Sequence, residues 1–335
     1  MATTVNYAFE EFMNEKVNLS EIDTETAKIS REHLIETIHS FSGRNGFYNL
    51  ANRYDSNFGS FSRKTKIRPL DDIDIIIGLA GRNVSFDCHQ WNDIRMKINI
   101  ATDPLYDSTD QVFSNGYLNS NMVKNQFKKM LGNVSKYYKA DIHSQGAAVT
   151  LELLSYDWVF DIVPAFYTDS CNGKNGYLIP NGKGNWKFTN PDIEQERITR
   201  VNKKHNGNVL NTIRLVKYWN KRAQIPTMSS YVLETMIVDY FDKLLGKIPQ
   251  WIEQRFGDVL CFIANNIYLP IFDSKGIEGN INTLTWDEMV KIQNRAKSDC
   301  EKAYFAIYTE TMEKNQQKAI NIWRGIFGEE FPTYG

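Results

Sequence analysis

The amino-acid sequence predicts an α+β fold, in which N-terminal helices and a mixed β-sheet are followed by a helical bundle. Apolar residues near the start of the chain recur at helical spacing. The middle of the chain carries short runs with strand periodicity, and the last third reads as helix almost throughout. A chain of 335 residues is long enough for two lobes with separate cores. We therefore predict a core domain that includes the N-terminal helices over residues 1–190 and a helical lobe over residues 191–335.

Each predicted element rests on periodicity or on a chain breaker. Strands are predicted over residues 51–58, 72–79, 146–154 and 158–163, the last two forming a hairpin across Ser155-Tyr156-Asp157. Residues 169–191 are rich in Gly, Asn and Pro, which predicts a loop with one or two short strands. The predicted helices span residues 6–16, 21–42, 120–131, 192–204, 207–222, 229–244, 249–266, 285–302 and 304–327.

Composition excludes several classes of protein. The net charge is −1, so no global positive field would hold long nucleic acid. No apolar run approaches the roughly 20 residues of a membrane-spanning helix, and the N-terminus lacks a secretory pattern, so we expect a cytoplasmic protein without membrane partners. The four cysteines are far apart, with no CxxC, and the five histidines add no metal-ligand spacing, so neither a zinc site nor a disulfide framework is expected. These cysteines are Cys88, Cys171, Cys261 and Cys300.

The clearest chemical signal is Gly59-Ser60 followed by Asp72-Ile73-Asp74. Two carboxylates at i and i+2 on a strand share one face and can chelate a hard divalent cation such as Mg²⁺. A Gly-Ser turn lets backbone N–H groups and a hydroxyl approach phosphate oxygens. Taken alone, an Asp-x-Asp is more often a strand end with solvated acids. The apolar run at residues 75–77 instead predicts that these acids lie on a buried strand, where a carboxylate is costly unless it has a partner or a metal ion.

Asp161 is the second signal, because it is the one carboxylate in the apolar run from Trp158 to Pro164. A buried charge needs a partner or a metal ion. A salt bridge to a lysine or arginine is the alternative. If the run lies in the same sheet as Asp72 and Asp74, a shared metal site is the better interpretation.

These residues carry a family resemblance. The run GSFSRKTKIRPLDDIDIII resembles the signature of the nucleotidyltransferases and, more narrowly, of the bacterial CD-NTases, which are related to cyclic GMP-AMP synthase. Lys64 departs from the glycine that usually precedes Thr65 in this pattern, and we expect it to alter the turn without removing chemistry. The likeness continues from residue 59 to the C-terminus through Phe160–Ala165, Arg214–Asn220, Ser229–Glu234 and Trp323–Pro332.

The resemblance implies a polymerase-β-like core with the active site in the cleft between core and helical lobe. It implies two Mg²⁺ ions, replaceable by Mn²⁺, with Asp72, Asp74 and Asp161 as metal ligands and catalytic residues in attack on an α-phosphate. Nucleotide binding would fall to Gly59 and Ser60 in the core and to three residues of the helical lobe. These are Lys217 and Ser230, on the triphosphate, and Tyr231, stacked on a base.

Each of these assignments has a structural alternative. Lys217 is alternatively a surface lysine, Tyr231 a packing residue between lobes, and Ser230 an N-cap. The basic residues Arg63, Lys64, Lys66 and Arg68 are more often a solvated face than a phosphate patch. Asp71 and Asp157 are not assigned to metal, because the first has the opposite strand parity and the second lies in a predicted turn.

The function that the resemblance implies is the joining of ribonucleoside triphosphates, such as ATP and GTP, into a cyclic di- or trinucleotide second messenger. The product would activate a separate effector in anti-phage (CBASS-type) signalling. Alternatives are a transferase that modifies an RNA end or a protein side chain, and an inactive nucleotide-binding scaffold. Gly335 at the C-terminus would permit ligation to a partner, although a terminal glycine is more often only a frayed end.

Overall fold

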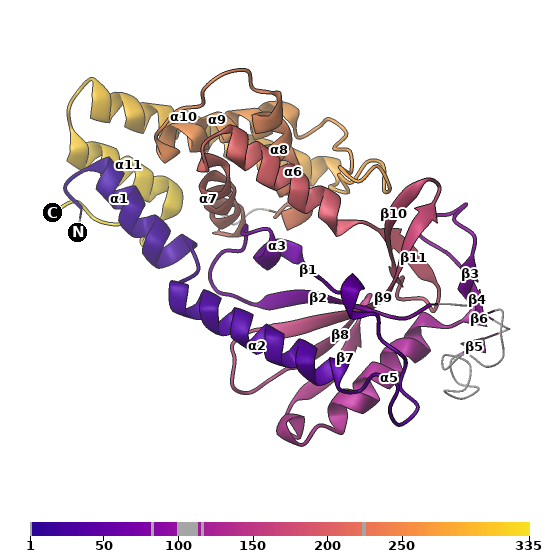
Figure 1. Cartoon of the computed structure of the whole chain (residues 1–335). Helices are drawn as coiled ribbons and strands as arrows, with labels where there is room; N and C mark the ends of the chain where they lie inside the picture. The colour runs from indigo at the N-terminus through magenta and orange to yellow at the C-terminus, as the bar shows by residue number, and fades with distance from the viewer. Residues whose placement is uncertain (1, 82–83, 99–112, 115–116, 223–225) are drawn as a thin grey trace. The chain divides into compact units, whose positions relative to one another are not determined.

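The chain forms two compact units, and their content confirms the α+β class. The computed structural model describes residues 2–81, 84–98, 113–114, 117–222 and 226–335 (Figure 1). The sheet unit comprises Glu21–Arg63 and Leu70–Gln195, and the helical unit comprises Met1–Ser20, Lys64–Pro69 and Glu196–Gly335. No helix in the described part of the chain is long and apolar enough to cross a membrane.

A mixed seven-stranded sheet organises the sheet unit. Its main path runs β1-β2-β9-β10-β11, and the hairpin β7-β8 joins through β8 to β9. Only the β2–β9 pair is parallel among these pairings, because the chain returns to β9 through the hairpin. The strands are β1 (Ser56–Phe58), β2 (Asp72–Gly78), β7 (Asp141–Gln145), β8 (Ala148–Glu152), β9 (Val159–Cys171), β10 (Lys174–Pro180) and β11 (Trp186–Thr189).

The two faces of the sheet differ in what they pack against. Alternate residues of β2 and β9, such as Ile73, Ile75 and Phe160, are fully or almost fully buried. Helices α2 (Glu21–His39) and α5 (Ser120–Gly132) contact β2 and β8 and bury apolar stripes of their own. On the opposite face of these strands, Ile76 and Val163 belong to a smaller apolar cluster. The aspartates of β2 and β9 lie on this same face, nearer the start of each strand. The carboxylates thus stand at one end of a sheet face whose other end is apolar.

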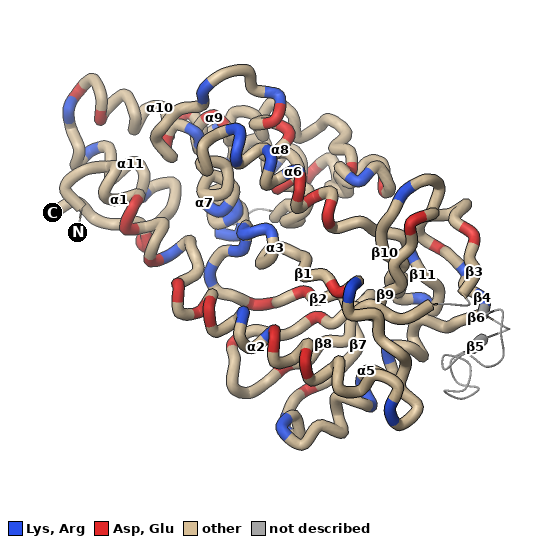
Figure 2. The backbone as a smooth tube through the Cα atoms, viewed as in Figure 1, with Lys and Arg blue, Asp and Glu red and all other residues tan. Residues whose placement is uncertain are grey.

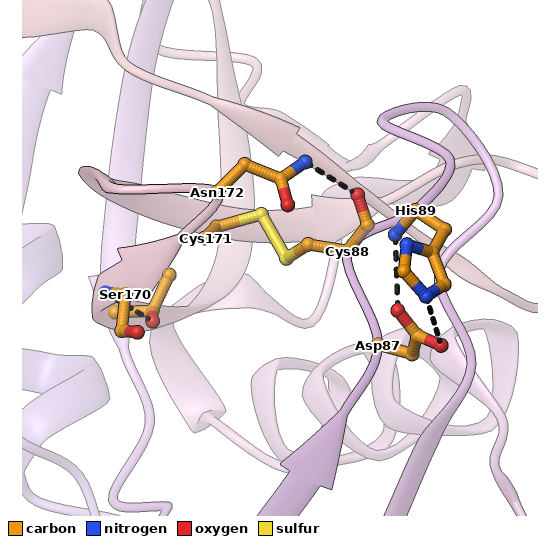
Figure 3. Close-up of a disulfide and its surroundings, with 7 residues drawn as sticks. Asp87, Cys88, His89, Ser170, Cys171 and Asn172 are labelled. Carbon is orange, nitrogen blue, oxygen red and sulfur yellow. Dashed lines mark hydrogen bonds and ion pairs between the residues drawn. A yellow bond between two sulfur atoms is a disulfide. The ribbon is translucent and has the colours of Figure 1, made fainter.

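A disulfide between Cys88 and Cys171 contradicts the expectation from cysteine spacing. The Cα atoms lie 5.6 Å apart although 83 positions separate the two residues in sequence. Cys171 ends β9, and Cys88 lies in the connection between the two strands of a small antiparallel pair, β3 (Val84–Phe86) and β4 (Met96–Ile98). The side chain of Asn172 donates to the Cys88 carbonyl at 2.8 Å (Figure 3). The sheet topology brings the two cysteines together, which linear spacing cannot reveal. A two-residue pair of strands, β5 (Phe113–Ser114) and β6 (Tyr117–Leu118), completes the described strands of this unit.

The helical unit is built around one apolar core. The second disulfide, Cys261–Cys300, joins α9 to α10, so the expectation of unpaired cysteines is wrong there as well. A capping box, in which Thr285 and Glu288 exchange hydrogen bonds, starts α10. The helices are α1 (Val5–Phe12), α7 (Asn208–Arg222), α8 (Ser230–Lys243), α9 (Ile252–Asn266), α10 (Trp286–Thr311) and α11 (Gln316–Phe327), while α6 (Pro191–Lys204) crosses the unit boundary.

The N-terminal segment differs from the predicted domain division. Helix α1 and the π-helical turn Met13–Val17 pack into the helical unit, not into the sheet unit. The ring of Phe9 lies 4.9 Å from that of Trp323, and the ring of Phe12 lies 5.0 Å from that of Tyr218. The first contact joins the two ends of the chain, and the second joins α1 to α7. On the C-terminal side the boundary falls at Gln195, close to the predicted residue 190.

Three predicted elements need correction. Residues 51–58 form a 3₁₀ turn before a strand of only three residues. The predicted loop over residues 169–191 contains the end of β9 and all of β10 and β11. Helix α10 runs unbroken through residue 303, because Ala303 and Ala306 are fully buried and continue its apolar stripe.

Candidate active site

The parallel pairing of β2 with β9 brings the three predicted carboxylates together. Asp74 is the direct Cα partner of Asp161, and Asp72 lies two residues before Asp74 on the same face. All three are half-buried, whereas their neighbours of opposite parity are buried. Both acidic strands are therefore side by side, as the shared-site interpretation requires, and the acidic residues of β2 can be followed in red in Figure 2.

Thr150 on β8 orients Asp161 from the other side. It is the Cα partner of Asp161, is 3% exposed, and its hydroxyl donates to Asp161 Oδ1 at 2.6 Å. The bond fixes one oxygen of the carboxylate. Sequence reasoning missed this residue, although a threonine opposite the acid in a predicted hairpin was an available signal.

Gly59 is fitted against Asp74 by steric necessity. Phe58, the last residue of β1, pairs with Asp74, and the chain then turns into the short helix α3 (Gly59–Ser62) with φ +74° at Gly59. A Cβ at this position would lie 1.7 Å from Asp74 Oδ2. The glycine therefore lets the turn touch the carboxylate. Ser60, the next residue, is half-buried in the first turn of α3.

The donor types and the strand register fit a hard divalent cation, which prefers carboxylate oxygens. The side chains as they stand do not form a closed ligand set. Among the described residues, no three His, Cys, Asp or Glu side chains are placed so that they could hold a metal ion. The backbone thus supplies the arrangement, and metal binding stays a prediction.

Lys217 is not the exposed surface lysine of the structural alternative. It is 6% exposed on α7, and its ammonium lies 2.7 Å from Glu234 Oε1 on α8. Glu234 is 2% exposed, so both members of the pair are buried. Removing one member of such a pair leaves an uncompensated buried charge, so we expect substitution of either residue alone to destabilise the contact between α7 and α8.

The start of α8 separates two adjacent serines by role. Ser229 is the N-cap, since its side chain accepts from the amide of Val232. Ser230 is the first helical residue and is exposed, so the N-cap alternative for Ser230 is wrong. Its hydroxyl is not used to cap the helix.

Tyr231 is held by a loop of the helical unit. Its hydroxyl donates to Asp273, and the ammonium of Lys275 lies 4.3 Å from its ring centroid. The ring is partly buried against the helical core. These contacts lie within one unit and orient the ring.

The basic segment after α3 is largely engaged with the protein. Arg63 pairs with Glu194 at 3.2 Å within the sheet unit. In the helical unit, Arg68 donates to the carbonyls of Asn18 and Asn14. A uniformly solvated face is therefore not observed for these two arginines.

Lys64 keeps the turn in the conformation that a glycine favours. Its φ is +60°, and its carbonyl accepts from Arg214 at 2.7 Å. Left-handed backbone costs a residue with a side chain roughly 1 kcal/mol. Lys64 therefore holds a left-handed conformation that a glycine would adopt without this cost.

Comparison with known proteins extends these observations. No family model matches the chain. A protein of Bacillus cereus (strain VD146) named probable cyclic nucleotide synthase is 37% identical over 340 residues, covering 100% of this chain and 99% of the relative. A cyclic AMP-AMP-AMP synthase of Acinetobacter sp. (strain ATCC 27244 / 9458) is 24% identical over 200 residues, covering 57% of this chain and 55% of the relative.

Solved structures show the same fold at low identity. CdnC of E. coli MS115-1 with ATP superposes with a TM-score of 0.70 at 15% identity, over 98% of both chains. CdnC in a complex with HORMA-deltaN gives 0.69 at 16%, also over 98% of both chains. The GTP-bound form of Vibrio cholerae DncV gives 0.66 at 10%, over 98% of this chain and 96% of the other.

Proposed function

Because the chain belongs to the bacterial CD-NTase family of cyclic nucleotide synthases, we propose that it joins ribonucleoside triphosphates into a cyclic di- or trinucleotide and releases pyrophosphate. The observation that carries this proposal is the register of Asp74 beside Asp161, with Asp72 on the same face and Gly59 fitted against Asp74. A relative matched over its whole length supports the same activity.

In each proposed step, the oxygen of a ribose hydroxyl attacks the α-phosphorus of a triphosphate. The bond from that phosphorus to the bridging oxygen breaks, pyrophosphate leaves, and the hydroxyl proton passes to water. Two or three such steps close a ring. Mg²⁺ held by Asp72, Asp74 and Asp161 would activate the hydroxyl and neutralise charge on the leaving group. The hydrogen bond from Thr150 restricts the rotamer of Asp161, so less side-chain freedom would be lost when this carboxylate binds a metal ion.

Nucleotide binding in this proposal is assigned to five residues. Gly59 and Ser60 let the turn before α3 approach phosphate oxygens. Lys217 and Ser230 contact the triphosphate, and Tyr231 stacks on a base, a contact worth roughly 1–3 kcal/mol. The exposed hydroxyl of Ser230 and the oriented ring of Tyr231 support these two roles. The buried pair of Lys217 with Glu234 requires that any phosphate contact compete with that carboxylate or share the ammonium with it.

The proposed biological role is anti-phage signalling of the CBASS type, in which the product activates a separate effector. The proposed location is the cytoplasm, where ribonucleoside triphosphates are available. The solved complex of CdnC with HORMA-deltaN supports a further protein partner. Ligation through Gly335 is a separate proposal. It requires release of the C-terminal residues from the N-terminus, since the Ala2 amide donates to Thr333 O at 2.8 Å and Tyr334 forms an isolated β-bridge with Ala2. Unchanged conjugation of Gly335→Glu in cells that carry the neighbouring genes would exclude it.

Pyrophosphate release tests the assignment of the carboxylates. Wild-type protein with the four ribonucleoside triphosphates and Mg²⁺ should release pyrophosphate, and Asp74→Asn or Asp161→Asn should lower the rate by at least about 10²-fold. Asp157→Asn is the matched control, because this exposed acid lies just before β9 and should leave the rate unchanged. Equal rates in wild type and Asp74→Asn would overturn the proposal. Nucleotide binding without release would favour the scaffold, and release only with added RNA or protein acceptors would favour the alternative transferase.

A further inference from the structure

The 267–285 loop between α9 and α10 is organised around one buried carboxylate, that of Asp273, whose side chain is 0% exposed. Asp273 Oδ2 accepts from the amides of Ile277 and Glu278, each at 3.0 Å, and Oδ1 accepts from the amide of Lys275 at 3.1 Å. Burial alone would raise the pKa of Asp273, but the hydrogen bonds from Tyr231 and the loop amides and the charge of Lys275 together lower it. The carboxylate is therefore a fixed anion at the centre of the loop.

This carboxylate reaches out of the loop to one side chain, Tyr231 on α8. Lys275 Nζ lies 3.4 Å from Asp273 Oδ1, 3.1 Å from the Tyr231 hydroxyl and 4.3 Å from the centroid of the tyrosine ring. Lys275 is only 8% exposed. The ammonium thus lies against the ring of Tyr231, while the carboxylate holds its hydroxyl.

We propose that Asp273 and Lys275 are positioning residues for nucleotide binding, which fix the ring of Tyr231 so that its remaining surface stacks on a substrate base. The proposal rests on the proposed function, in which Tyr231 is the base platform. It adds that the platform is preorganised by the loop before α10. A ring already held in one orientation loses less freedom when a base binds.

The residue types of the clamp, by which we mean Asp273 and Lys275 around the ring of Tyr231, argue against a purely structural role. A buried ion pair contributes little net stability, because the cost of desolvating the two charges offsets most of their attraction. The loop is already closed by backbone bonds, including Asp273 N to Gly279 O at 2.8 Å and Ile281 N to Ile271 O at 2.7 Å. Covering Tyr231 with a charged side chain is therefore best explained by a requirement on the orientation of the ring.

The test compares dissociation constants for a nonhydrolysable triphosphate with the kcat and KM of pyrophosphate release. Tyr231→Ala removes the platform and should weaken binding by about 10-fold or more. Tyr231→Phe and Lys275→Met keep the ring and should each raise the dissociation constant and KM by about 3- to 10-fold with little change in kcat, as expected for lost ground-state binding. The double variant should be no weaker than the worse single one, because both changes release the same clamp.

Lys318→Met is the matched control, because Lys318 also lies over an aromatic ring, 5.1 Å from the centroid of Phe305, elsewhere in the helical unit. It should leave the dissociation constant unchanged. Lowered thermal stability in Lys275→Met with unchanged binding would overturn the positioning role. Unchanged binding in Tyr231→Ala, in an enzyme that still makes a cyclic product, would overturn the clamp and leave the synthase assignment intact.

Discussion

Replacing Gly59 with alanine tests how closely the turn is fitted to the carboxylate of Asp74. The new Cβ would lie 1.7 Å from Asp74 Oδ2 and 2.6 Å from its Cγ, whereas ordinary contact begins at 3.4 Å. Half of the required separation is missing, so the carboxylate or the turn must move. Asp74 is paired to Phe58 on one side and to Asp161 on the other, which limits how far its strand can withdraw.

Gly46→Ala supplies the matched control for the backbone term. Gly46 has φ +73°, almost the same as +74° at Gly59, and a Cβ there would meet nothing within 4 Å. It should cost only the left-handed strain of roughly 1 kcal/mol. Gly59→Ala should add about 1–3 kcal/mol of overpacking, for a total of about 2–4 kcal/mol.

Two assays separate stability from function in these variants. Urea unfolding gives the free energies, and pyrophosphate release by protein shown to be folded gives the rates. Displacing a catalytic group by about 1 Å can cost about 10²-fold in rate, so Gly59→Ala should lose at least that much while Gly46→Ala stays near wild type. Equal destabilisation in the two variants together with a wild-type rate for Gly59→Ala would refute the argument that this glycine is fitted to Asp74.

Three further predictions concern stability. Burial raises the pKa of Glu253 from 4.5 to about 7, so the folded state holds the proton more tightly, and the free energy of unfolding falls by about 3 kcal/mol as pH rises between these values. Glu253→Gln should remove this pH dependence, and its free energy of urea unfolding should exceed that of the wild type at about pH 8 but not at about pH 5. Parallel pH profiles of the two proteins would contradict this prediction. Lys64→Gly relieves a φ of +60° and should raise the free energy of unfolding by about 1 kcal/mol. Lys66→Gly is the control, because φ is ordinary at Lys66 and glycine there should lower the free energy of unfolding. A lower free energy of unfolding in Lys64→Gly would show that the strain is absent. Cys88→Ala/Cys171→Ala removes a disulfide between residues 83 positions apart and should lower the free energy of urea unfolding by about 4 kcal/mol. Detection of free thiols at these two cysteines, in protein unfolded without reductant, would show instead that the disulfide is not formed.

The parts of the fold that were predictable have strong local signals. In the run DIDIIIG, the acidic residues and the isoleucine between them point to opposite faces when the segment is extended, and this period predicts the strand β2. The hairpin before Asp161 was likewise visible, although β9 continues eight residues past the predicted end, to Cys171. Loop-like composition concealed β10, because Gly176 and Asn175 read as turn residues when the pairing with β9 and β11 is unknown. Tertiary pairing overrides local propensity at such positions.

The predictable part of the site is its set of residue types, and the rest depends on contacts between distant segments. Period and motif placed Asp72 and Asp74 on one face. The predicted hairpin was a signal for a threonine opposite Asp161, but it did not establish the hydrogen bond from Thr150. Nothing in the sequence showed that Asp273 and Lys275, more than forty positions from Tyr231, would hold its ring. The disulfides were missed for the same reason, since the chain's topology sets which cysteines meet.

The central claim is that the carboxylates of β2 and β9 catalyse formation of a cyclic nucleotide. The most direct test is mass spectrometry of the phosphatase-resistant products formed from all four ribonucleoside triphosphates with Mg²⁺, by wild type and by Asp72→Asn/Asp74→Asn in parallel. We expect a cyclic di- or trinucleotide from the wild type and none from the variant. Linear products alone, or the same cyclic product from both proteins, would contradict it.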